Sequence, residues 1–303
     1  MRPSIVIVAL AATALAATPR ALAAQSLDTT VAVRSGARFE LHDVSGSIRI
    51  QAWDRPQIRI VAQADGARVD VDASPSYVVV RTTPRGDEGD VDYRVSVPAG
   101  TPLEAHGIST DVTVSGVCGE ANLTSISGDV TLRCGAGDVQ VRSISGDVTV
   151  SDVRGQGGHL DIGSTSGNVD VGDVRGDVGA QSVSGDITLA RVDGRDVRAE
   201  TVNGDIGFSG PIHDGGRYTF RSHSGDVTVR PEGALNALVS VSTFSGDVES
   251  DWPMTINPGG GPVGPREWEF TIGSGGARLR LESFSGTIYL RRGGAAAPTG
   301  GDR

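Results

Sequence analysis

The sequence contains no lysine, and every one of its basic residues is arginine. Lys and Arg together number 27 against 37 Asp and Glu, giving a formal net charge of −10. Phosphate groups are held by basic patches, so we expect an acidic chain with scattered arginines to be a poor binder of nucleic acids and anionic membranes. The absence of lysine also excludes any chemistry that requires a lysine amine.

Aromatic residues make up only 4% of the chain. This scarcity argues against a large globular core and against the aromatic platforms that bind sugars. No stretch of the sequence sustains the 3.6-residue period of a helix, so the chain is not expected to be helical.

Long apolar runs are absent apart from one at the start. Arg2 precedes the apolar segment 5–17, and Ala21-Leu22-Ala23 follows it. This pattern predicts a secretory signal peptide over residues 1–23, because the run is too short for a membrane span. No cysteine follows to carry a lipid anchor, and no membrane span is expected elsewhere. We therefore expect an exported protein of the periplasm, the cell envelope or the extracellular space.

Glycine is abundant, with 43 residues, and it falls in a repeated phrase. The phrase is apolar–Ser–Gly–Asp–apolar–Thr–apolar, as at 126–132, 144–150 and 183–189. A looser Gly phrase lies between successive copies, so the unit is a pair of half-turns of 18 to 21 residues. Fixed-period self-similarity indicates stacked repeats.

The alternation inside each phrase predicts the fold. Apolar residues stand two before, two after and four after each Gly, with polar residues between them, which is typical of short strands. We predict an all-β, single-domain β-solenoid resembling a parallel β-helix, with two short strands per rung and the apolar residues inside. We expect the Gly to hold a positive φ at the corner, with Asp capping the turn through its own backbone. The alternative is a Gly that points into a thin slab.

The repeats do not fill the whole chain. We predict an irregular N-terminal β region over 25–107, belonging to the same domain and capping the first rung, and solenoid repeats over 108–292. Residues 251–266 form an insertion rich in Gly and Pro, and 293–303 form a disordered tail.

The two cysteines are Cys118 and Cys134. The repeat places them on neighbouring rungs near the same corner, and an exported chain can keep a disulfide. A bridge between them and a pair of free buried thiols are both compatible with the spacing.

The repeated Ser-Gly-Asp-Val-Thr-Val phrases resemble those of a bacterial putative-adhesin family of unknown function, described as toast-rack-like β-solenoids. The phrase Gly46-Ser47-Ile48-Arg49-Ile50, followed by Trp53-Asp54, and the strand ending in Val95-Ser96-Val97-Pro98 are also similar to that family. The resemblance covers residues 36 to 292. It implies an envelope β-repeat protein without established catalytic residues, so no catalytic residue is assigned.

One column of side chains suggests a ligand. Stacked rungs would align a row of carboxylates, and calcium would relieve their repulsion. Turn capping is the competing explanation, because calcium-binding β-rolls place Asp two residues after a Gly and not directly after it. The candidate column is Asp129, Asp147, Asp186, Asp205, Asp226 and Asp247.

The function best supported by the sequence is that of a non-enzymatic, exported envelope protein, an adhesin or structural and interaction scaffold, that needs no cofactor. Its partner would be a macromolecule of the envelope or a surface ligand, and the sequence specifies no oligomeric state. A calcium-stabilised secreted β-roll is one alternative. The other is a carbohydrate-active β-helix enzyme, although neither a long loop nor a lysine is available to build its site. His223 occupies an apolar slot of the repeat and is expected to be buried or half-buried.

Overall fold

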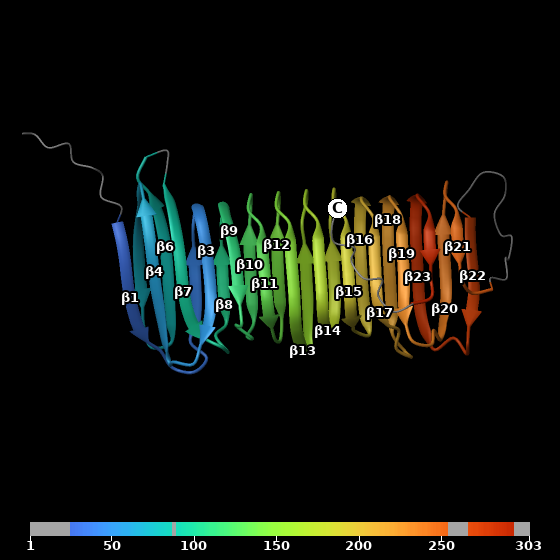
Figure 1. Cartoon of the computed structure of the whole chain (residues 1–303), viewed down its shortest axis with the longest axis horizontal. Helices are drawn as coiled ribbons and strands as arrows, with labels where there is room; N and C mark the ends of the chain where they lie inside the picture. Colours follow the sequence, from blue (N-terminus) through green and yellow to red (C-terminus); the bar gives the residue numbers. More distant parts are fainter. Residues whose placement is uncertain (1–24, 87–88, 254–265, 294–303) are drawn as a thin grey trace, which may run out of the picture.

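The protein is a rod of stacked β-strands with two faces (Figure 1). The computed structural model describes residues 25–86, 89–253 and 266–293, and within them it contains strands and no helix. The predicted signal peptide therefore lies outside the described residues, as do most of the predicted insertion and all but Gly293 of the predicted tail. In the described part of the chain, no helix is long and apolar enough to cross a membrane.

Each face of the rod is a ladder of paired strands. The first face has, in spatial order, β5 (Ala67–Ala73), β6 (Tyr77–Pro84), β2 (Arg38–His42), β8 (Leu103–His106), β10 (Ala121–Ser125), β12 (Val139–Ser143), the ends of β13 (Val148–Gly163) and β14 (Val169–Gln181), β16 (Asp196–Asn203), β18 (Arg217–Ser224), β23 (Ala277–Ser285), β20 (Ala237–Thr243) and β22 (Arg266–Ile272). The second face has β1 (Gln25–Ala32), β4 (Gln57–Asp65), β7 (Asp90–Pro98), β3 (Ser45–Trp53), β9 (Ser109–Ser115), β11 (Val130–Gly135), the starts of β13 and β14, β15 (Ile187–Asp193), β17 (Ile206–Pro211), β19 (Val227–Glu232), β24 (Ile288–Leu290) and β21 (Val248–Ser250).

Parallel pairing in register runs through the middle of the rod. Val130 pairs with Val148, Val148 with Val169, and Val169 with Ile187, so the repeat of 18 to 21 residues corresponds to one rung. Antiparallel pairs occur only near the ends, at β1–β4, β4–β7, β5–β6 and β20–β22. The predicted all-β solenoid with two short strands per rung is confirmed.

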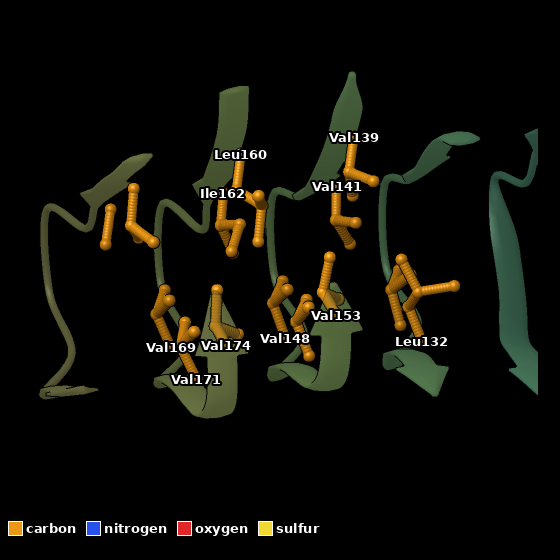
Figure 2. Close-up of a cluster of buried hydrophobic side chains, with 14 of the residues drawn as sticks. Leu132, Val139, Val141, Val148, Val153, Leu160, Ile162, Val169, Val171 and Val174 are labelled. Carbon is orange, nitrogen blue, oxygen red and sulfur yellow. The ribbon is translucent and has the colours of Figure 1, made fainter. Parts of the chain in front are cut away.

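The core is a thin slab of aliphatic side chains between the two faces. Val130, Val148 and Ile187 are completely buried, as the alternation predicts. Figure 2 shows valines of the second face, such as Val148 and Val169, pointing toward Leu160 and Ile162 of the first face. The buried cluster extends from β2 to β24, so the strands of the N-terminal region pack on the same core as the repeats.

The order of rungs departs from chain order at both ends. The β2/β3 rung lies between β6/β7 and β8/β9, so the later β6/β7 rung sits outside it. At the other end, the β23/β24 rung lies between β18/β19 and β20/β21. At the N-terminal end β6 and β7 fill the place between the earlier strands β5 and β4 and the β2/β3 rung. At the C-terminal end β23 and β24 fill the place between two earlier rungs.

One corner of the rod is turned by residues other than glycine. Cys134, Asp152, Asp173 and Arg191 have φ between 55° and 75° and stack in one column at the ends of the second-face strands. This left-handed conformation is uncommon outside glycine. β13 and β14 continue as strands through this position, whereas β11 and β15 end within two residues of it. Cys134 of this column forms a disulfide with Cys118, and their Cα atoms are 5.1 Å apart.

The opposite corner carries the Ser-Gly-Asp phrases, and there the expectation of a positive φ is wrong. Gly146, for example, has no positive φ. A methyl group placed on its Cα would overlap the carbonyl oxygen of Gly128 and lie 3.0 Å from the amide nitrogen of Asp129, both in the preceding rung. The same overlap recurs at Gly167 and Gly185. Glycine is required because the backbones of successive rungs meet at this corner.

We expect Gly146→Ala to destabilise the fold by about 3 kcal/mol or more, because backbone on both sides of the contact has to move. Gly207→Ala is the matched control. Gly207 lies in β17, where a methyl group added to its Cα would have no atom within 4 Å, so that change should be neutral or stabilise by about 0.5 kcal/mol. Urea unfolding of both variants measures the difference, and equal stabilities would contradict the packing argument.

Candidate functional site: a groove along the Ser-Gly-Asp corner

A column of buried hydroxyl groups lines the inside of the Ser-Gly-Asp corner. In seven rungs the residue three before the Gly turns inward and donates a hydrogen bond to a carbonyl oxygen of the preceding rung. Ser143 Oγ donates to Gly128 O at 2.9 Å, and Ser164 Oγ to Gly146 O at 2.9 Å. The bonds continue from Ser182, Thr201, Ser222 and Ser283. Thr243 holds this position in the Gly246 rung, and its hydroxyl is buried without a hydrogen-bond partner among the described residues. Each of the seven bonded rungs is therefore joined to the preceding one at the corner by a side chain as well as by backbone.

The next residue in each rung points outward, which corrects one prediction. The apolar residue two before the Gly was expected inside, but it follows an inward-facing Ser in extended backbone and so faces solvent. Ile144 is 48% exposed and Phe284 47% exposed. We call this row the apolar ladder; in spatial order it is Ile126, Ile144, Thr165, Val183, Val202, His223, Phe284 and Phe244.

The far end of the apolar ladder is a stack of rings. His223 and Phe284 have ring centroids 4.7 Å apart with planes 13° apart, and Phe284 and Phe244 have centroids 4.8 Å apart with planes 3° apart. His223 is exposed, so the expectation of a buried or half-buried histidine is wrong. Because the rings cover one another's faces, they present mainly edges to a ligand.

A groove of about 930 Å³ runs beside the apolar ladder, with the buried hydroxyl column in its floor. Its second wall is formed by the residues four before each Gly, which we call the polar row. In spatial order the polar row is Thr124, Arg142, Gly163, Gln181, Glu200, Arg221, Glu282 and Ser242. The groove therefore has one apolar and one mixed-charge wall, and it follows the long axis of the rod.

Charges on the polar row are paired within the chain. Arg142 bonds Asp161, and Arg221 bonds Glu282 and lies 3.7 Å from Glu200. Burial alone would raise the pKa of Glu282, but hydrogen bonds from Arg221 and Arg280 outweigh it and hold that pKa below its usual range. Glu282 is thus an ionised partner of arginines at neutral pH and not a protonated general acid.

The aspartates that follow the Gly residues form hydrogen bonds from rung to rung. Asp129 Oδ1 accepts from the amide of Asp147 at 2.9 Å, and Asp147 Oδ1 from the amide of Asn168 at 2.7 Å. Asp186, Asp205 and Asp226 accept in the same way from the next rung. The expected capping within the same turn is therefore replaced by capping between rungs. Asp247 is separated from Asp226 by Thr287, which occupies the intervening rung.

These contacts bear on the calcium alternative. Each bonded aspartate has one oxygen committed to a neighbouring amide, and Asn168 replaces a carboxylate in the column. Among the residues that the structure describes, no group of three or more His, Cys, Asp or Glu is placed to hold a metal ion.

The hydroxyl column ends at a buried carboxylate. Asp43 occupies the serine position of the β2/β3 rung and is only 4% exposed. Thr82 Oγ1 donates to one of its oxygens at 2.7 Å and Thr110 Oγ1 to the other at 3.0 Å, while Tyr93 Oη bonds Thr82 Oγ1 at 2.7 Å. Burial raises the pKa of Asp43, although these hydroxyls partly offset it. Nothing in the repeat phrase signalled this cluster, because Asp43 lies just before the phrase Val44-Ser45-Gly46, at a position to which the phrase assigns no residue type.

We expect Asp147→Ala to cost about 1 kcal/mol of stability, since the amide of Asn168 loses its acceptor. Asp147→Asn should leave stability unchanged, because an amide oxygen accepts the same bond, as Asn168 already does for Asp186. Thermal melting with and without chelator is the measurement. A melting temperature that falls in chelator, and does so less in Asp147→Asn, would favour the calcium alternative.

Asp43 should make stability depend on pH. A carboxyl whose pKa is raised on folding contributes most when protonated, and that contribution is lost as pH rises from its unfolded value, near 3.8, through the higher folded value. Asp43→Asn removes this titrating carboxyl. The free energy of unfolding of the wild type should therefore fall relative to that of the variant over this pH range, and the difference should stay constant at higher pH. Urea unfolding between pH 3 and pH 7 tests this, and a difference independent of pH would contradict it.

Comparison with known proteins gives a family match. The model of the Toastrack DUF4097 family matches residues 38–291. No curated protein matches the chain. Two similar solved structures are a putative cell adhesion protein from Clostridium sporogenes (8% identity, covering 89% of this chain and 100% of that one, TM-score 0.22) and a putative adhesin from Parabacteroides distasonis (10% identity, covering 89% and 98%, TM-score 0.33).

TM-scores below 0.5 do not establish a shared arrangement of strands, so these two structures contribute nothing to the assignment. The family model, by contrast, spans most of the chain, and the resemblance drawn from the Ser-Gly-Asp phrases is confirmed by it. The protein belongs to the Toastrack DUF4097 family, whose function is unknown.

Proposed function

We propose that the protein is an exported, non-enzymatic envelope protein that binds a macromolecule along the groove of the Ser-Gly-Asp corner. The observation that carries this proposal is the apolar ladder. Large side chains such as Ile144 and Phe284 are nearly half exposed along one row, which only Thr165 and His223 interrupt, and exposed apolar patches mark interaction sites.

The chemistry of the groove favours binding over catalysis. Its two carboxylates, Glu200 and Glu282, each bond an arginine of the first face. Glycoside hydrolysis needs one carboxyl that stays protonated and one that is free to attack or to activate water, and arginine pairing opposes the first requirement. The groove wall repeats the same kind of side chain at every rung. It therefore suits an extended partner that makes a weak contact with each of many rungs better than it suits a small substrate.

Export is supported by the sequence and by the cysteines. Residues 1–23 have the composition of a signal peptide. Cys118 and Cys134 form a disulfide in the structure, and such bonds persist in oxidising compartments. We place the protein in the periplasm, in the envelope or outside the cell, with an adhesin or scaffold role.

Site-specific photo-crosslinking in living cells tests the proposal. A photoreactive residue in place of Ser145, beside the apolar ladder, should capture a macromolecule of the envelope or of the attached surface. The same residue in place of Thr113, on the exposed second face, is the control and should capture much less. Ile144→Asp should abolish capture at position 145. Equal capture at both positions, or none at either in a strain whose attachment is unchanged by deleting the gene, would count against the proposal.

A further inference from the structure

The apolar ladder is periodic, and its period restricts which partners can match it along its whole length. Rungs repeat every ~4.8 Å, so one outward side chain stands at each such step along the rod. Side chains on one face of an extended peptide repeat every ~6.8 Å, and the turns of an α-helix every ~5.4 Å. Both drift out of step with the apolar ladder over its eight rungs. A second copy of the same rod has the same repeat and stays in step throughout.

We propose that the apolar ladder binds the apolar ladder of a second copy of this chain, with the two rods antiparallel. This inference rests on the proposed interaction function of the same groove and names the partner. Figure 1 shows strands that keep nearly the same direction along the rod, so that one edge can face another over many rungs.

Reversing the order of the apolar ladder against itself gives well-matched pairs. A two-fold axis between the Val183 and Val202 rungs places the only two polar members, Thr165 and His223, opposite each other. It also sets each phenylalanine against an isoleucine, which keeps the thickness of the contact even. The four pairs, each formed twice, are Ile126 with Phe244, Ile144 with Phe284, Thr165 with His223, and Val183 with Val202.

The polar row is compatible with the same arrangement. The same two-fold axis sets Arg142 opposite Glu282, Gly163 opposite Arg221, and Gln181 opposite Glu200. No like charges face each other, and one opposite pair is brought together. Parallel rods related by an axis along their length would set the polar row against the row of exposed serines instead. They would also stack phenylalanine on phenylalanine at one end only. Charge and shape therefore both favour the antiparallel arrangement.

The size of the contact sets the expected strength. Eight rungs span roughly 34 Å, and a strip about 15 Å wide buries on the order of 500 Å² per copy, near the lower limit for a specific interface. We therefore expect a dimer that dissociates in the micromolar range and is not obligate.

Sedimentation velocity of the mature chain over a wide concentration range measures the association. Ile144→Asp and Val202→Asp should each weaken dimerisation at least tenfold, because each substitution places two charges in a two-fold contact. Thr113→Asp, at an exposed position of β9 away from the apolar ladder, should leave it unchanged. A chain that stays monomeric at all concentrations, or a dimer indifferent to both apolar-ladder variants, would overturn the inference.

Cysteine crosslinking tests the direction of the rods. Ser127 and Ser245 are exposed beside Ile126 and Phe244, and all cysteines in the described residues are disulfide-bonded. A mixture of Ser127→Cys and Ser245→Cys chains should form a covalent heterodimer on oxidation, and neither variant alone should link to itself. Self-linking of Ser127→Cys, or no link in a mixture that still dimerises, would overturn the antiparallel arrangement.

Failure of this inference is separable from failure of the proposed function. A monomeric chain that still captures a different macromolecule at position 145 would overturn self-association and leave the binding role standing. A dimer that captures only further copies of itself in cells, in a strain whose attachment does not depend on the gene, would support self-association and remove the wider binding role.

Discussion

Close approach of successive backbones at the Ser-Gly-Asp corner is the constraint from which much of the rod follows. Rungs stack at ~4.8 Å, and at the Gly positions of this corner a Cβ atom would overlap the backbone of the neighbouring rung. Gly146 lies at the point of closest approach. On either side of it, the hydroxyl of Ser143 donates to the carbonyl oxygen of Gly128, and the carboxylate of Asp129 accepts from the amide of Asp147. The Gly and Asp of the phrase thus serve one contact together with the Ser or Thr that stands three residues before the Gly. The serine of the phrase itself, such as Ser145, is exposed and takes no part in it.

The exposed apolar ladder is a consequence of that same corner. The serine must face inward to reach a carbonyl oxygen, and the following residue is then directed to solvent by the alternation of extended backbone. Folding alone does not require an isoleucine or phenylalanine at such a position, since a polar residue there would be tolerated, as Thr165 shows. Side chains of this row contact one another between rungs, as the stacked rings of Phe284 and Phe244 do, yet they remain nearly half exposed. The contact with another surface that we propose would bury the exposed part.

The sequence predicted the architecture well because the repeat is regular. Alternation around each Gly identified Val130, Val148 and Ile187 as core residues, and they are fully buried. The prediction from alternation was wrong where the position of a residue depends on contacts with another rung. The reason for Gly146 and the outward direction of Ile144 depend on contacts between rungs, which one strand's pattern does not contain. Cys134 and Arg191 adopt a left-handed conformation that their residue types do not predict. The carboxylate of Asp43 is hydrogen-bonded to two threonines that are far from it in the sequence.

The displaced rungs at the two ends have a consequence for how the molecule is assembled and how its length can change. The β23/β24 rung enters between β18/β19 and β20/β21, so a chain emerging from its amino end cannot complete the rod until its last strands arrive. A repeat can be gained by duplication or lost by deletion only between β9 and β18, where chain order and spatial order agree. A chain that lacked the strands of a displaced rung, such as β23 and β24, would therefore have a gap between two remaining rungs. It would not form a shorter rod with every rung paired.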